Sequence, residues 1–318
     1  MSRCMKRSAV IFLILFSCVS LGVASEPETR ARASVDSNAV SVETDSLQFL
    51  LREQPRSQSL QWYTMFERIP GDWVRFANLN FREERIPALV AMTALTAAAI
   101  ATDQPVWEVS DRWYKSSRTV KDISDFFVYL GDGKPQFGLA AAFGLYGFWK
   151  EDERALRTAS QLVQTILACG TVIQVMKHIT GRESPFVSTR TNGRWVFFPD
   201  QVVYHQKVPH YDAFPSGHIA TATATLVVIM ENYPEWKPWL RPLSYFIIAG
   251  IGIGLSNTGI HWWSDYPLGI ALGYQFGMIA ARPEGLEVFK SDTPDAPSLS
   301  LTPEVSIQRQ GVRLTLNF

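Results

Sequence analysis

Six segments of the chain combine a high apolar content with a length that is typical of helices. Apolar runs of about 10–14 residues are more often buried helices, whereas a bilayer span needs about 20. Leu240–Ser256 comes closest to that length, and the last three segments are rich in Gly, Ala, Ile and Val. We therefore predict an all-α bundle that is embedded in or associated with a membrane. Its expected helices are 86–101, 137–149, 159–176, 217–231, 240–256 and 265–281.

The segments that flank these helices are more polar. Residues 59–84 mix aromatic and charged side chains, which predicts an amphipathic helix followed by a turn at residues 70–72. The stretch 102–136 is polar with scattered aromatic residues, and we assign no helix to it. The segment 190–198 contains an Asn-Gly dipeptide, which predicts a short β-hairpin.

The N-terminus has the features of an export signal over residues 1–24. Three basic residues precede an apolar run, and the small-x-small site Gly22-Val23-Ala24 follows it. An uncleaved membrane anchor is the alternative. Residues 25–58 are rich in Ser, Glu, Arg, Asp and Thr, so we expect a flexible segment there.

The helical domain is expected over residues 59–281, followed by a C-terminal tail over 282–318. Apolar and polar residues alternate at the end of this tail, over 312–318, which predicts a strand. Its partner is expected at 298–302 or at 304–308. The fold class is therefore a helical bundle with a short C-terminal β-hairpin.

Composition limits the kinds of partner. The 318 residues are 47% hydrophobic and 19% charged, so a large core or a membrane environment is available. Lys plus Arg and Asp plus Glu each number 30, and nothing in this balance suggests nucleic acid. Signal cleavage would leave Cys169 as the only cysteine, so no disulfide is expected and this thiol is interpreted as packing.

Candidate chemistry begins at the stretch Ala213-Phe214-Pro215-Ser216-Gly217-His218, which opens the fourth apolar segment. Ser216 is a good helix cap, and Gly217 allows a close approach to the backbone. The first turn of a helix has unpaired N–H groups and a partial positive charge, so it favours anions. His218 in that turn is placed to protonate a group that leaves the bound anion.

Two further stretches lie at helix ends. Lys177 and Arg182 occur where the third segment ends, a few residues before Pro185. His261 and Asp265 occur four positions apart where the sixth segment begins, and they share one helical face if the sixth helix starts near His261. Asp265 is then expected to fix the His261 tautomer that leaves the other ring nitrogen nucleophilic.

Together these stretches resemble the phosphatidic acid phosphatase type 2 superfamily over about residues 120–281. The family pattern is Lys, six residues, Arg-Pro; then Pro-Ser-Gly-His; then Ser-Arg, five residues, His, three residues, Asp. The resemblance implies a metal-independent phosphatase without a cofactor that forms a phosphohistidine. It implies that His261 is the nucleophile, that Asp265 orients it and that His218 is the general acid and base. It also implies that phosphate is held by Lys177, Ser216 and Gly217.

Two arginines of the family pattern are missing. Ser184 stands at the first position, before Pro185, and Gly254-Leu255 stand at the Ser-Arg pair. A charged hydrogen bond to phosphate is worth about 1.5–3 kcal/mol, so the loss of two would weaken catalysis substantially. We predict that Arg182, two residues away, replaces one of them in phosphate binding.

Three functions remain open at this stage. The leading one is a phosphatase for a phosphomonoester or pyrophosphate of a lipid, in or at a membrane. A soluble exported acid phosphatase with small substrates is the second. A catalytically silent bundle that binds phosphate or lipid headgroups is the third, because the two arginines are missing. In each case the export signal predicts a cell-envelope location, inner membrane or periplasm, with the site facing the periplasm.

Overall fold

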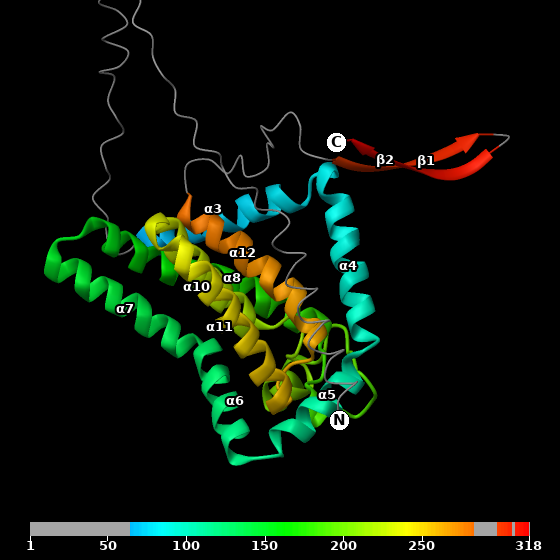
Figure 1. Ribbon diagram of the computed structural model, residues 1–318, viewed down its shortest axis with the longest axis horizontal. Coiled ribbons are helices and arrows are strands. Elements are labelled where there is room, and N and C mark those ends of the chain that lie inside the picture. Colours follow the sequence, from blue (N-terminus) through cyan, green and yellow to red (C-terminus); the bar gives the residue numbers. More distant parts are fainter. Residues whose placement is uncertain (1–63, 283–297, 307–308, 318) are drawn as a thin grey trace, which may run out of the picture. The chain divides into compact units, whose positions relative to one another are not determined.

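The structure is a computed structural model that describes residues 64–282 and the backbone of 298–306 and 309–317 (Figure 1). The predicted export signal and the predicted flexible segment lie outside the described residues. The chain divides into two compact units, with the boundary after Ala281. The first unit carries every motif residue and is a bundle of helices.

All six expected helices are present, so the predicted all-α class is confirmed. Their bounds differ from the expected ones by a few residues, as is usual for boundaries read from apolar content. The longest helix is extended at both ends by charged or polar residues, which periodicity alone does not assign. The observed helices are α4 (Ile86–Ile100), α7 (Gly133–Lys150), α8 (Glu153–Thr180), α10 (Gly217–Asn232), α11 (Lys237–Thr258) and α12 (Tyr266–Ala281).

The turn predicted at residues 70–72 is wrong, because α3 (Thr64–Asn80) continues through it. Contacts with α8 explain the continuation. The carboxylate of the buried Asp72 accepts a hydrogen bond of 2.6 Å from Gln164 Nε2, and Trp73 Nε1 donates to the Ala168 carbonyl at 3.1 Å. These buried polar contacts outweigh the local preference of Pro and Gly for a turn.

The polar stretch 102–136, to which no helix was assigned, contains two helices. They are α5 (Asp103–Tyr114) and α6 (Arg118–Gly131). Ser117 caps α6 by accepting a hydrogen bond from the Val120 N–H, and apolar residues of α6 pack against a core cluster that includes Ile251. Asp132 alone separates α6 from α7, and its side chain caps α7. Both helices are amphipathic, so their apolar content is too low to stand out.

The β-hairpin predicted over 190–198 is also wrong. The segment forms a turn, and Trp195 makes an isolated bridge with Arg182 instead of pairing within the segment. Glu183 supplies the reason: its buried carboxylate accepts hydrogen bonds of 3.0 Å from the N–H groups of Thr189 and Arg194. These donors are therefore not available to a ladder within the segment.

The helix α10 lies among α8, α11 and α12 at the centre of the bundle (Figure 1). Its closest neighbour is α12, because a Cβ atom on Gly273 would lie only 2.1 Å from the Ala220 carbonyl oxygen. A glycine at this position lets the two helices pack backbone to backbone. The first turn of α10, which carries His218, is thereby brought close to the start of α12, which directly follows Asp265.

Short helical segments complete the first unit, and those between α8 and α10 and between α11 and α12 form loops at the motif end of the bundle. They are η1 (Glu83–Arg85), η2 (Pro185–Val187), α9 (Gln201–Gln206), η3 (Val208–His210), η4 (Pro234–Trp236) and η5 (Trp263–Asp265). In the second unit, β1 (Ser298–Ser306) and β2 (Arg309–Asn317) pair antiparallel. Residues 312–317 face 298–303, the first of the two partners that the sequence left open.

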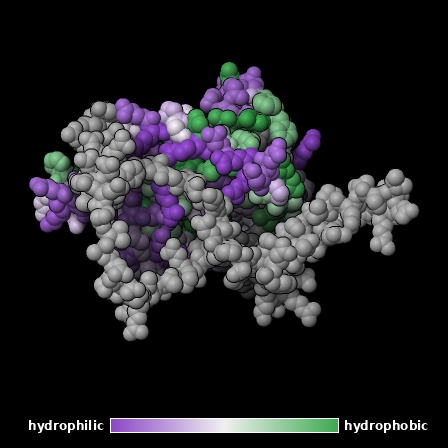
Figure 2. All heavy atoms as spheres, turned by 90° about the horizontal axis from the view of Figure 1, so that it is seen from above, coloured by the Kyte–Doolittle hydropathy of each residue, from purple (hydrophilic) through white to green (hydrophobic). Residues whose placement is uncertain are grey.

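Membrane-crossing length is reached by fewer helices than the six apolar segments suggest. Within the described residues, α8 and the segment Pro234–Thr258 are long and apolar enough. Together, α4 and α5 would make a third span that is bent by 56°. Large apolar side chains are exposed on several helices, and Figure 2 shows hydrophobic patches on one face of the molecule between hydrophilic residues. Examples are Val90, Leu145, Phe148, Trp149 and Phe246.

Candidate active site

The three motif stretches meet at one end of the bundle. Lys177 lies in the last turn of α8, His218 in the first turn of α10, and His261 in the turn between α11 and α12. The α8 helix ends just after Lys177 because Gly181 adopts φ 51°, and a Cβ atom there would lie 2.1 Å from the Val196 carbonyl oxygen. Only glycine fits this position, which turns the chain back over the site.

Ser216 ties two of the motif stretches together. Its side chain accepts a hydrogen bond of 3.4 Å from the Ile219 N–H, so it caps α10 as the sequence predicts. Its own N–H donates to the Asp265 carbonyl at 3.1 Å. The turn that carries His218 is therefore fixed against the turn that carries His261.

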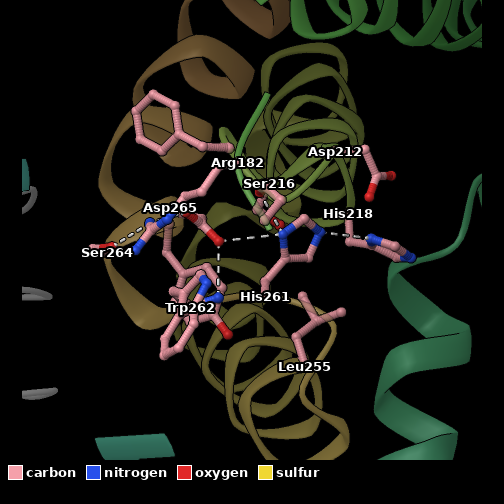
Figure 3. A network of polar contacts seen from close by, with 12 residues as sticks. Arg182, Asp212, Ser216, His218, Leu255, His261, Trp262, Ser264 and Asp265 are labelled. Atoms are coloured by element: carbon pink, nitrogen blue, oxygen red, sulfur yellow. Dashed lines mark hydrogen bonds and ion pairs between the residues drawn. The ribbon is translucent and has the colours of Figure 1, made fainter. Parts of the chain in front are cut away.

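The two motif imidazoles face one another (Figure 3). His218 Nδ1 lies 3.4 Å from His261 Nε2. On its other side, His261 Nδ1 lies 2.7 Å from the Ala213 carbonyl oxygen. Because a carbonyl oxygen only accepts hydrogen bonds, we assign the proton of His261 to Nδ1. Nε2 then carries a lone pair that points toward His218.

Asp265 lies on the far side of His261 from His218 (Figure 3). Its Oδ2 is 3.5 Å from His261 Nδ1 and accepts a hydrogen bond of 2.8 Å from the Trp262 N–H. Arg182 donates to its Oδ1. The sequence expected Asp265 alone to orient the imidazole, but the Ala213 carbonyl is the nearer partner. Any residue supplies such a carbonyl, so no sequence signal points to it.

Burial controls the protonation of these groups. His261 is 2% exposed, and burial together with the nearby Lys177 ammonium lowers its pKa to about 3. His218 is half-buried, and its pKa is lowered for the same reasons and by His261. Burial raises the pKa of Asp265 to about 6, against the opposing effect of Arg182. At neutral pH both imidazoles are therefore neutral and Asp265 is ionised.

Lys177 is buried beside both histidines, with its Nζ 3.5 Å from Asp212 Oδ2. The Asp212 side chain is 29% exposed and lies on the His218 side of the site (Figure 3). Its charge is felt at both imidazoles. The sequence analysis did not single out Asp212, although it directly precedes the Ala213–His218 stretch.

Arg182 lies behind Asp265, on the side away from His218 (Figure 3). It is fully buried, and its guanidinium donates to Asp265, Ser264, Asp103 and the Asn192 carbonyl. The sequence prediction placed Arg182 on the phosphate. In this geometry Nη1 and Nη2 donate to protein groups instead, and the buried Nε has no hydrogen-bond partner among the described residues.

The two departures from the family pattern are buried positions. Ser184 is 2% exposed, and its N–H donates to the Pro209 carbonyl at 2.9 Å. Leu255 is fully buried, and its carbonyl accepts from the Ile260 N–H at 3.1 Å. Among residues 64–282, no group of three or more His, Cys, Asp or Glu side chains is arranged to hold a metal ion.

Comparisons with known proteins agree with these motifs. Residues 158–283 match the model of the PAP2 superfamily. This segment belongs to the PAP2 superfamily. The matched PAP2 segment runs from α8 to the end of α12, so it contains Lys177, His218, His261 and Asp265 but not α5.

Two similar proteins accompany this PAP2 match. A stretch of 66 residues is 33% identical to a lipid A 1-phosphatase of Porphyromonas gingivalis. This stretch covers 21% of this chain and 15% of that protein. A solved structure, described as the first transmembrane PAP2 type phosphatidylglycerolphosphate phosphatase from Bacillus subtilis, is 15% identical with a TM-score of 0.44. That similarity covers 61% of this chain and 92% of the Bacillus chain.

Proposed function

We propose that this protein is a phosphatase that hydrolyses a phosphomonoester or pyrophosphate of a lipid through a phosphohistidine. One observation carries the proposal: the lone pair of His261 Nε2 points at His218 across 3.4 Å, from a buried imidazole whose other nitrogen is fixed by a carbonyl. A neutral, oriented imidazole is what nucleophilic attack on phosphorus requires. The low pKa of His261 keeps it in this form at neutral pH.

In the first step, His261 Nε2 attacks phosphorus, and the bond from phosphorus to the leaving oxygen breaks. The bound phosphate anion favours the imidazolium form of His218, which takes up a proton from solvent when the substrate binds. This imidazolium donates its proton to the leaving oxygen and becomes neutral, so the product leaves as an alcohol or as a phosphate. The 3.4 Å contact between the imidazoles is too short to hold a phosphoryl group. Substrate binding therefore requires the half-buried His218 ring to rotate away from His261.

In the second step, His218 takes a proton from water, and the resulting hydroxide attacks the phosphorus of the phosphohistidine. The bond from phosphorus to Nε2 breaks, and inorganic phosphate leaves with His261 restored. The negative charge on the phosphoryl oxygens is balanced by Lys177, the Ser216 hydroxyl and the Gly217 N–H at the start of α10. For Arg182 we propose a different part, the holding of Asp265, as its contacts indicate.

A lipid substrate is supported by the relatives and by the helices. The lipid A 1-phosphatase and the phosphatidylglycerolphosphate phosphatase are both described as acting on lipid phosphates. In the part of the chain that the structure describes, two helices are long and apolar enough to cross a membrane, and one of them, α8, ends beside the site with Lys177. We infer a cell-envelope location with the site facing the periplasm, from the predicted export signal.

The test is phosphate release from a long-chain phosphatidic acid in detergent micelles, in the presence of EDTA, by the full chain. We expect release by the wild type and none above background by His261→Ala, which removes the nucleophile. His178→Ala is the matched control, because His178 lies outside the contact between the motif imidazoles and stacks on Tyr204. Equal release by the wild type and His261→Ala would overturn the proposal, and loss of wild-type activity in EDTA would overturn metal independence.

A bundle that binds phosphate without catalysis is the second candidate. It is favoured by Ser184 and Leu255 at the positions of the family arginines, and by the ion pair of Lys177 with Asp212. Its signature is saturable binding of inorganic phosphate without turnover of any phosphate ester. Acid-labile phosphate on His261 after a brief pulse of labelled substrate would exclude it.

A further inference from the structure

A buried ionic cluster supports the catalytic turn from outside the PAP2 segment. Asp103, the first residue of α5, is 1% exposed and accepts a hydrogen bond from Arg182. The same guanidinium donates to Asp265 on its other side. One arginine thus joins two carboxylates in a site without exposure to solvent.

Asp103 also accepts hydrogen bonds from the turn that carries His261 and Asp265. Its Oδ1 accepts from the Ser264 N–H at 3.2 Å, and its Oδ2 accepts from the Ser264 hydroxyl at 2.6 Å. Every oxygen of this carboxylate is used on the turn or on Arg182. The neighbouring residue, Gln104, donates its N–H to the Asn192 side chain at 2.9 Å, and the Asn192 carbonyl accepts from Arg182.

Burying a carboxylate is costly unless it is paired and hydrogen-bonded, and a buried pair is rarely a gain over apolar packing. A buried ionic cluster of this kind is therefore expected where it holds a functional side chain in a defined position. Here the fixed group is Asp265, which in turn lies 3.5 Å from the nucleophilic imidazole. We propose that Asp103 is a positioning residue for the proposed phosphatase reaction, acting on His261 through Arg182, Ser264 and Asp265.

The position of Asp103 in the chain gives this role a wider consequence. It lies at the bend of 56° between α4 and α5, the pair that would make a third, broken membrane span. The bend is thus attached directly to the catalytic turn.

The test is Asp103→Asn in the full chain, measured as kcat and KM for phosphatidic acid over a pH series. We expect kcat to fall roughly 10- to 100-fold with little change in KM, because the nucleophile is misplaced whereas the protein groups that bind phosphate stay in place. The charged groups that face Asp265 are Arg182, Asp103 and, more distantly, Lys177, with His261 beside it. Loss of the Asp103 charge favours the ionised form of Asp265, so the acid limb of kcat/KM moves to lower pH.

Asp111→Asn is the matched control, because Asp111 is on the same helix and pairs with Lys115 away from the site. It should leave kcat and the acid limb unchanged. Ser264→Ala covers the case in which Asp103→Asn does not fold, since it removes a contact of Asp103 without removing a charge. It should lower kcat by a smaller factor, roughly 3- to 10-fold, and leave the acid limb in place.

The outcomes separate this inference from the function on which it rests. An active wild type whose kcat and acid limb are unchanged in folded Asp103→Asn overturns the positioning role alone. If Asp103→Asn is unfolded, wild-type kcat in Ser264→Ala overturns it instead. A wild type without phosphatase activity overturns the proposed function, and the positioning role falls with it.

Discussion

Asp212 gives the anion site an unusual balance of charge. Its carboxylate faces Lys177 at 3.5 Å, where a phosphoryl oxygen is expected to bind, and neither family arginine is present to compensate. An anion that approaches Lys177 must therefore overcome a like charge. Phosphate is expected to bind this site weakly, which favours release of the product.

Replacement of this carboxylate provides a test. We expect Asp212→Asn to lower the inhibition constant of inorganic phosphate by roughly 3- to 10-fold, because a like charge near the anion is removed. Competitive inhibition of ester hydrolysis measures it. Asp122→Asn, at a largely exposed side chain on α6, is the control and should leave inhibition unchanged. Weaker inhibition in Asp212→Asn would indicate that the carboxylate helps to hold the anion, through a shared proton.

Anion binding should also take up a proton. Burial and Lys177 lower the pKa of His261 to about 3, and they lower the pKa of His218 as well. A bound dianion favours the imidazolium form and raises these pKa values, so affinity should increase as pH falls from 8 to 6. Sulfate is the suitable probe because its own charge is constant in this range. Calorimetry in two buffers of different ionisation enthalpy should give an uptake of up to one proton per sulfate.

His218→Gln is the control for that titration, because it removes the imidazole that faces the leaving group. The uptake should fall strongly while sulfate still binds at Lys177. An affinity that is constant between pH 6 and 8 in the wild type would contradict the assigned protonation states.

At the residue scale, the groups that the sequence could predict are those with a chemical signature. The Lys, His and Asp residues of the three motif stretches do converge, and the two imidazoles face one another as expected. The Ala213 carbonyl and Asp103 were missed for different reasons. A carbonyl has no residue-type signal, and Asp103 lies in a polar stretch that no motif marks.

Helix ends place the motif residues, and α8 shows how a single backbone conformation does so. Gly181 ends α8 at φ 51°, and Lys177 accepts the hydrogen bond of this cap with its carbonyl. We expect Gly181→Ala to reduce the free energy of unfolding by about 1–2 kcal/mol, because alanine disfavours the left-handed conformation. A clash of the new Cβ atom with the Val196 carbonyl oxygen should reduce it further.

Gly138→Ala is the matched control for this cap. Gly138 lies within α7, and a Cβ atom there would meet nothing within 4 Å, so alanine should stabilise the helix by up to about 1 kcal/mol. Thermal unfolding of both variants in the same detergent measures the difference. Equal melting temperatures for the two variants would show that the left-handed cap is not required.

The elements that the sequence predicted best are those whose environment is uniformly apolar. The helices α10 and α12 were found within one or two residues, because both are buried along most of their length. The amphipathic α5 and α6 were missed, and the turn expected within α3 was wrong, because their structure depends on partners in other parts of the chain. Asp72 is an example: its buried carboxylate accepts a hydrogen bond from Gln164 of α8.

At the scale of the whole molecule, the site depends on two parts of the chain that sequence comparison treats differently. The PAP2 segment supplies His218, His261 and Lys177, whereas α5 supplies the carboxylate that closes the cluster around Arg182. The segment alone therefore leaves Arg182 and Ser264 without the carboxylate to which they donate. We infer that α4 and α5 are part of the functional unit.

The relation to the bilayer decides between a lipid phosphatase and an exported soluble enzyme. Two helices, α8 and the segment Pro234–Thr258, are long and apolar enough to span, and large side chains such as Phe148 and Phe246 are exposed. Water around such side chains is unfavourable by about 25 cal/mol per Å² of apolar surface, which lipid relieves. We expect the full chain to stay in the membrane pellet after alkaline carbonate washing and to require detergent for release. A peripheral protein leaves the pellet under carbonate, so recovery of an active, monodisperse chain in the wash would contradict membrane insertion and favour the soluble enzyme.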